Sequence, residues 1–236
     1  MNFPTTSWSL VLAAKQERSG ASRSALERLC KEYWYPVYAY IRSRKSSPED
    51  ARDLTQEFFL RLLDKHYLDA IEAPHGRFRW FLLAGIKNFL ANEYDRSRAQ
   101  KRGGGRVFLS LQMDGAEQMY RLEPVDQLTP EKIFDRRWSL LLLDRAIQRL
   151  QRDYAKSGKE RQFDNLKQYL VGDDAGQPYR ATARALGTTE GAIKVAIYRL
   201  RRDFAEVLRA EIAETVLNEN EVDAELRFLI TATGAR

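Results

Sequence analysis

Apolar residues recur at helical spacing along almost the whole chain, whereas the alternating pattern of a half-buried strand is scarce. Residues 46–50 form a typical helix start, since they offer a capping serine, a proline for the first turn and then two acids. The helix that they open places one apolar side inward, made of Ala51, Leu54, Phe58 and Leu62. These patterns predict an all-α protein.

A second long helix is predicted over residues 77–98, with an inward face made of Leu82, Ile86, Phe89 and Leu90. The stretch 111–131 differs in character, because it holds five acids against one arginine and contains two prolines. This composition predicts a flexible acidic linker between two helical domains.

A helix-turn-helix is predicted near the C-terminus. Ala183 is small where two helices must approach closely, and Gly187 follows where the first helix must stop in a left-handed conformation. Thr188 and Thr189 can cap the next helix, and Ile193 reaches back into the core. An ordinary helical hairpin shows a similar pattern. The basic second helix favours a DNA-reading unit, because such a helix suits a major groove.

Composition narrows the function classes. The formal net charge of +6 suits a polyanionic partner. A single cysteine, Cys30, allows no intramolecular disulfide and no cysteine-rich zinc site, and we expect it to be buried. His66 and His75 lie in no metal-ligand spacing, so we expect no metal, no cofactor and no catalysis. The chain start lacks the pattern of a signal peptide, and we expect a cytoplasmic protein without membrane insertion.

The order of these elements resembles bacterial RNA polymerase sigma factors of the extracytoplasmic-function (ECF) type. Residues 50–63 look like that family's core-polymerase-binding helix, and 77–82, continuing to Asn88 and Asn92, look like its −10 recognition helix. Residues 179–204 look like its −35 helix-turn-helix. Three further stretches resemble a longer subgroup with a C-terminal extension: 101–105, 134–138 and 222–227.

The resemblance implies two helical domains on a tether. Residues 1–109 would form a region 2-like domain that binds the polymerase and −10 DNA. Residues 110–133 would be the linker, which threads into polymerase channels in that family, although a plain solvated linker has the same composition. Residues 134–210 would form a region 4-like −35 domain. Residues 211–236 would be an acidic extension, which either docks on the DNA-reading domain or simply extends the last helix with a frayed end.

The resemblance also implies three binding surfaces. The polymerase-binding surface would comprise Asp50, Asp53, Gln56, Glu57 and Leu60. The −10 surface would comprise Arg77, Arg79, Trp80, Lys87, Asn88, Asn92, Arg96, Arg98, Lys101 and Arg102. The −35 surface would comprise Thr188, Thr189, Glu190, Lys194, Val195, Tyr198, Arg199 and Arg202.

The residue types in these sets suit the implied tasks. Paired acids suit a basic partner helix, although a solvated acidic face has the same composition. Asparagine can bind base edges, lysine and arginine neutralise phosphate, and an aromatic ring can stack on an unpaired base. Phe78 shares the inward stripe with Leu82 and is expected in the core. Val195 departs from the polar or basic residues common in the family, and it could contact a thymine methyl group.

The function implied is promoter-specific transcription initiation, with core RNA polymerase and promoter DNA as partners and the free protein a monomer. An anti-sigma factor or another regulator is a further partner that the family allows. The competing interpretation is a free-standing helix-turn-helix transcriptional regulator, which would bind duplex DNA without polymerase. An enzyme built on Asp53, Glu57 and His66 is disfavoured, because no catalytic spacing is present.

Overall fold

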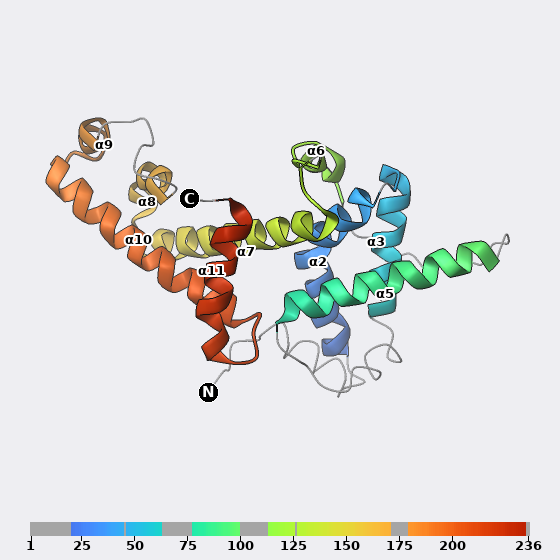
Figure 1. Ribbon diagram of the computed structural model, residues 1–236. Coiled ribbons are helices and arrows are strands. Elements are labelled where there is room, and N and C mark those ends of the chain that lie inside the picture. Colours follow the sequence, from blue (N-terminus) through green and yellow to red (C-terminus); the bar gives the residue numbers. More distant parts are fainter. Residues whose placement is uncertain are drawn as a thin grey trace. The chain divides into compact units, whose positions relative to one another are not determined.

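The computed structural model describes residues 20–44, 46–62, 77–99, 113–125, 127–170 and 179–234 (Figure 1). Every regular element in these ranges is a helix, which confirms the all-α prediction. The chain divides into two compact units. Unit 1 contains residues 1–140 and 213–236, and unit 2 contains residues 141–212.

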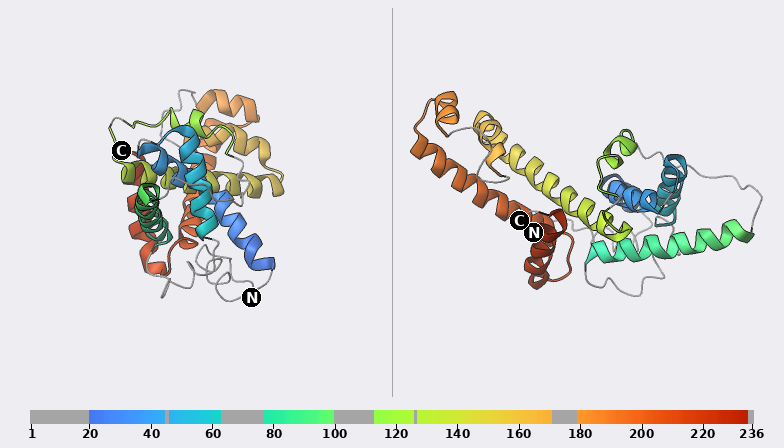
Figure 2. Two further views of the ribbon diagram at one scale, coloured as in Figure 1. Left: turned by 90° about the vertical axis from the view of Figure 1, so that its right-hand side faces the viewer. Right: turned by 45° about the horizontal axis from the view of Figure 1, so that its top comes forward.

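Two helices cross the unit boundary, because the chain leaves unit 1 within α7 (Pro130–Lys156) and returns at the end of α10 (Glu190–Ala213) (Figure 2). The other elements of unit 1 are α2 (Gly20–Ser43), α3 (Pro48–Leu62), α5 (Phe78–Ala99), α6 (Ala116–Tyr120), η2 (Glu219–Glu221) and α11 (Val222–Thr233). The other elements of unit 2 are α8 (Glu160–Leu166), η1 (Lys167–Leu170) and α9 (Tyr179–Leu186).

Aromatic rings from three helices form the core of unit 1. The rings of Tyr33 on α2 and Trp138 on α7 are stacked, with centroids 5.0 Å apart, and Phe78 at the start of α5 meets Tyr33 edge to face at 5.3 Å. All three side chains are buried, as is Phe134 one turn before Trp138. The start of α7 therefore belongs to unit 1, whereas the sequence placed residues from 134 onward in the second domain. A helical stripe shows which residues face inward but not which core receives them.

The described part of the expected acidic linker is folded. Helix α6 lies within it, and Glu117 on α6 accepts hydrogen bonds from two nitrogens of Arg42, Nε and Nη2, each at 3.1 Å. The buried Glu123 pairs with Arg136 at 3.1 Å and with Arg137. This differs from the flexible tether that composition indicated. Two of the acids that suggested a solvated linker are instead paired, Glu117 with a residue far along the chain and Glu123 with two arginines of α7.

The core of unit 2 joins α7, α8, α9 and α10. Its buried members are Leu150, Phe163, Leu166, Tyr169, Ala183, Ile193, Ile197 and Leu200. The buried Tyr169 and Thr182 hydroxyls share a hydrogen bond of 2.8 Å. At the far end of α10, the buried Glu211 accepts hydrogen bonds from Arg145 and Arg149 of α7. Glu211, which the sequence assigned to the C-terminal extension, therefore lies in α10 within unit 2.

Cys30 is buried in unit 1, as expected, and burial raises the pKa of its thiol to about 12. It therefore stays protonated at neutral pH. In the part of the chain that the structure describes, no helix has both the length and the apolar character needed to cross a membrane.

Candidate nucleic-acid interface

The turn between α9 and α10 has the geometry that the sequence predicts. Gly187 adopts a left-handed φ of 64°, and the Thr188 amide donates back to the Ala183 carbonyl at 2.9 Å, which closes the end of α9. The Ala192 amide donates to the Thr189 hydroxyl at 3.2 Å, so Thr189 caps α10. Ala183 and Ile193 are both buried between the two helices. The helix-turn-helix therefore forms within unit 2.

The outer face of α10 is exposed and basic. All eight residues predicted for −35 DNA are exposed, and the large side chains Tyr198 and Val195 are 71% and 50% exposed. Lys194 Nζ lies 5.8 Å from the centroid of the Tyr179 ring, and Arg202 pairs with Asp203 at 3.0 Å. Neighbouring Arg201 is different, because its Nε donates to the Tyr169 carbonyl and so serves the fold. The predicted residues thus share one accessible surface, which we call the α10 surface.

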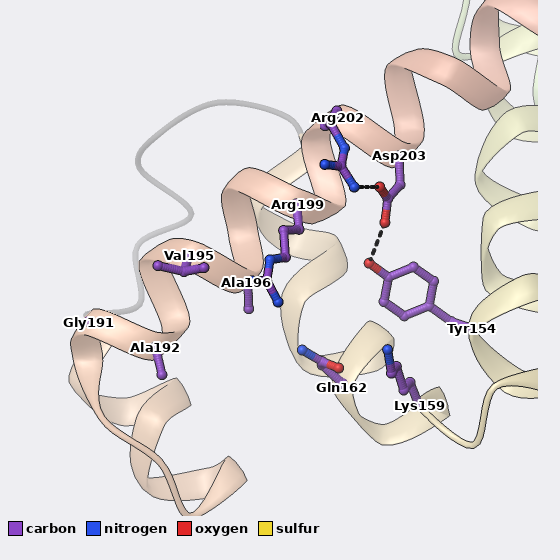
Figure 3. Close-up of a pocket in the computed structure, with 10 residues that line it drawn as sticks. All are labelled: Tyr154, Lys159, Gln162, Gly191, Ala192, Val195, Ala196, Arg199, Arg202 and Asp203. Atoms are coloured by element: carbon purple, nitrogen blue, oxygen red, sulfur yellow. Dashed lines mark hydrogen bonds and ion pairs between the residues drawn. The ribbon is translucent and has the colours of Figure 1, made fainter.

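A groove of about 740 Å³ runs along this surface between α10 and the α7–α8 junction (Figure 3). Val195, Arg199 and Arg202 line one wall, and Lys159 and Gln162 project from the other. Sequence reasoning missed Lys159 and Gln162, because they lie at the start of α8 rather than in the helix-turn-helix. The sequence carries no signal that links these positions to α10, which begins only at Glu190.

The predicted polymerase-binding residues lie on the outer side of α3. Ala51, Thr55 and Phe58 are buried on its inner side. On the outer side, Asp50 and Asp53 are exposed, and Gln56, Glu57 and Leu60 are half-buried. Asp50 also serves the helix start: its amide donates to the Ser47 hydroxyl at 3.0 Å, and its carboxylate accepts from that hydroxyl at 2.7 Å. Glu57 pairs with Arg61 one turn later.

The predicted −10 residues divide into buried and exposed groups. Arg79 is only 3% exposed, and Arg77 is half-buried beside it. Both arginines pair with the buried carboxylate of Glu225 on α11. In this conformation neither side chain is free to meet a phosphate, so the sequence expectation of direct DNA contact at Arg77 and Arg79 is not supported by their surroundings. Glu225 lies 146 positions from Arg79 in the sequence. The residues around Arg79 therefore give no sign that it is paired.

The exposed group lies farther along α5. Trp80, Asn88 and Asn92 are exposed, and Lys87 is exposed but paired with Glu131 of α7 at 3.0 Å. This pairing raises the pKa of Lys87 and lowers that of Glu131. A cleft of about 800 Å³ adjoins this pair, and Tyr94 also lines it. The side chains of two predicted residues, Arg96 and Arg98, lie outside the described part, as do Lys101 and Arg102 entirely.

Phe78 is fully buried in the aromatic core of unit 1, in agreement with its expected place beside Leu82. Within the described residues, no group of three or more histidine, cysteine, aspartate or glutamate side chains could hold a metal ion. The positions His66 and His75 lie outside the described ranges.

Fold and surface together define an all-helical protein with a helix-turn-helix unit that exposes a basic helix. Within that class, the chain is similar to the ECF RNA polymerase sigma factor BldN of Streptomyces coelicolor. The two are 28% identical over 193 residues, a stretch that covers 81% of this chain and 64% of BldN. No protein-family profile and no solved structure matches the chain. The similarity to BldN supports the ECF sigma-factor resemblance seen in the sequence.

Proposed function

We propose that this protein is a sigma factor of the ECF type, which binds core RNA polymerase, directs it to promoters by recognising −35 and −10 elements and aids DNA melting. The observation that carries the proposal is the α10 surface. The second helix of the helix-turn-helix is capped, accessible and basic, in a chain similar to an ECF sigma factor. We further assign it to the longer subgroup with a C-terminal extension.

The α10 surface reads the −35 duplex. Lys194 and Arg199 can reach base edges or phosphates, and Val195 offers an apolar contact to a thymine methyl group. Lys159 lies across the groove from Arg199, where a phosphate strand of a duplex held on α10 would meet a second cation. Association should therefore weaken steeply as salt rises, because phosphate contacts release counterions.

The exposed part of α5 captures the unpaired −10 strand. Its accessible groups are an indole and two amides, at Trp80, Asn88 and Asn92. Indole rings stack on bases and amides bind base edges, and both kinds of contact require the bases to be unpaired or open. The outer side of α3, with Asp53 and Glu57, binds a basic surface of the polymerase.

The test is run-off transcription with core RNA polymerase on a pool of genomic promoter fragments, with and without the protein. Specific transcripts that depend on the protein are expected, together with co-elution of the protein and core polymerase. The matched variant Asp53→Lys/Glu57→Lys should lose co-elution and transcripts together. Failure of the wild-type protein to bind core polymerase, combined with binding to duplex DNA alone, would contradict the proposal and favour the free-standing regulator.

A further inference from the structure

The C-terminal helix α11 is built into unit 1 at the start of α5 (Figures 1 and 2). The Phe78 amide, the first of α5, donates to the Thr215 carbonyl at 2.9 Å. Val222 and Leu229 of α11 are buried, and Glu225 between them is fully buried. The segment after residue 213 is therefore neither a frayed end nor an appendage of unit 2.

The Glu225 carboxylate is the centre of a buried ion-pair cluster. One oxygen lies 3.1 Å from Arg79 Nε and the other lies 2.9 Å from an Arg77 guanidinium nitrogen. Arg79 also pairs with Asp135 of α7 at 2.6 Å. Two arginines and two acids balance in charge, so the cluster offers no net attraction to phosphate. A buried carboxylate without partners would cost several kcal/mol, which keeps both guanidinium groups in place.

The guanidinium groups in turn hold Trp80. The central carbon of Arg77 lies 4.7 Å from the centroid of the Trp80 ring, and that of Arg79 lies 5.8 Å from it. The centroid of the Phe228 ring on α11 lies 3.7 Å from the central guanidinium carbon of Arg79. Trp80 remains 51% exposed. An indole held by two guanidinium groups loses rotational freedom, and a base that stacks on its exposed part then meets a fixed surface.

We propose that Glu225 is a positioning residue for DNA capture, which acts through Arg77 and Arg79 to hold Trp80 in the orientation that receives an unpaired base of the −10 strand. This inference rests on the proposed function and deepens it, because it makes the C-terminal helix a part of the −10 site. It also gives Arg77 and Arg79 a role that agrees with their burial.

If α11 instead masked a DNA-binding surface, loss of the Glu225 charge would change DNA binding in the opposite direction. If α11 covered Arg77 and Arg79 against DNA, removing the Glu225 charge would strengthen DNA binding. The geometry favours positioning, because Glu225 is fully buried and Arg79 is 3% exposed. A phosphate could reach Arg79 only after α11 had left unit 1, whereas Trp80 is accessible with α11 in place.

The experiment compares holoenzymes that carry wild-type protein, Glu225→Gln, Trp80→Ala or both changes. The probe is forked DNA from the promoter that run-off transcription identifies, with 2-aminopurine at one unpaired −10 position. Because stacking of one base contributes about 1–3 kcal/mol, Trp80→Ala should weaken fork binding by about tenfold and restore 2-aminopurine fluorescence. Glu225→Gln should do the same to a lesser degree, and the double variant should match Trp80→Ala.

The controls separate positioning from stability. Glu219→Gln changes an exposed acid of the same C-terminal segment and should leave fork binding unchanged. Binding to core polymerase and to duplex −35 DNA should be equal for all variants. If Glu225→Gln does not fold, Phe228→Leu, which removes only the ring beside Arg79, should show a smaller loss of the same sign.

Three results would overturn the inference. Unchanged fork binding and fluorescence for Glu225→Gln, with a loss for Trp80→Ala, would leave the proposed function intact and reject positioning. Tighter fork binding for Glu225→Gln would establish masking instead. No effect of Trp80→Ala would remove Trp80 from the −10 site, and positioning with it, while protein-dependent transcription would still support the sigma-factor proposal.

Discussion

The two helices that we propose to contact DNA, α10 and α5, present their basic residues in opposite ways. On α10, Lys194 and Arg199 are exposed and no described acid pairs with either, whereas the exposed Arg202 pairs with its neighbour Asp203 on the same helix. At the start of α5 and along it, each described cation of the predicted set is held by a carboxylate from another helix: Arg77 and Arg79 by Glu225, and Lys87 by Glu131.

This difference suits two forms of DNA. A duplex is bound largely through its phosphates, so a duplex reader exposes cations. An unpaired strand offers base faces and edges, so a surface that captures it can keep its cations internal and expose Trp80, Asn88 and Asn92. A basic residue on a helix is therefore not by itself a phosphate ligand. Whether it can bind phosphate depends on whether an acid already pairs with it, and that acid can lie anywhere in the chain.

The largest effect is expected from reversing the exposed, unpaired charges of α10, those of Lys194 and Arg199. Lys194→Glu/Arg199→Glu should weaken duplex promoter binding by the holoenzyme about 100-fold, since each such contact contributes about 1–3 kcal/mol. Lys156→Glu/Lys167→Glu reverses two exposed charges elsewhere in unit 2 and controls for the change in net charge. Equal losses for both variants in a filter-binding assay would show that α10 has no special role.

The next effect concerns the acids that hold α6 in unit 1. Hydrogen bonds from Arg42 and Tyr38 lower the pKa of Glu117. Its stabilising contribution is therefore full at neutral pH and is lost as the pH falls through the lowered pKa. Glu117→Gln should reduce the free energy of unfolding by about 1–3 kcal/mol at neutral pH, with a difference that shrinks in acid.

Urea unfolding across pH, followed by tryptophan fluorescence, measures this in unit 1, because all four tryptophans of the chain belong to that unit. A Glu117→Gln deficit that persists undiminished in acid would contradict the pairing. An absence of any deficit at neutral pH would indicate that the segment 113–125 does not depend on this contact for its place against α2.

A smaller effect is expected at the turn of the helix-turn-helix. Gly187→Val should destabilise unit 2 by about 1–2 kcal/mol, because a β-branched residue fits poorly at a φ of 64°. Gly187→Asn is the matched control, since asparagine tolerates this conformation. Amide hydrogen exchange in α9 and α10 should speed up for valine and change little for asparagine. Equal exchange in both variants would show that the turn imposes no such requirement.

The smallest effect is expected from freeing a paired cation of α5. Glu131→Gln removes the partner of Lys87 and should strengthen fork binding only a few-fold, because an exposed ion pair contributes about 0–1 kcal/mol. Asp114→Asn, an exposed acid of the same acidic segment, should leave binding unchanged. A weaker fork complex for Glu131→Gln would mean that the ion pair orders the surface rather than competes with DNA.

Local features of the fold were predictable from the sequence. Helical periodicity gave the all-α class, and Gly187, Thr189 and Ile193 gave the helix-turn-helix, because a positive φ, a cap and a core contact each depend on one residue and its neighbours. The accessible face of α10 followed from the same periodicity.

Contacts between distant residues were not predictable. The pairs Arg79–Glu225 and Arg42–Glu117 join positions 146 and 75 apart, and one sequence carries no signal that links them. Their absence from the prediction explains why the acidic stretch was expected to be a flexible linker and why Arg77 and Arg79 were placed on DNA.

The most direct test of the account is photocrosslinking from two positions of the holoenzyme on one promoter, with a photoreactive residue in place of either Tyr198 or Trp80. Position 198 should crosslink to the −35 duplex in both closed and open complexes, whereas position 80 should crosslink to a single −10 strand only after the promoter opens. Equal crosslinking from position 80 in closed complexes, or none in open complexes, would contradict the assignment of α5 to the unpaired strand.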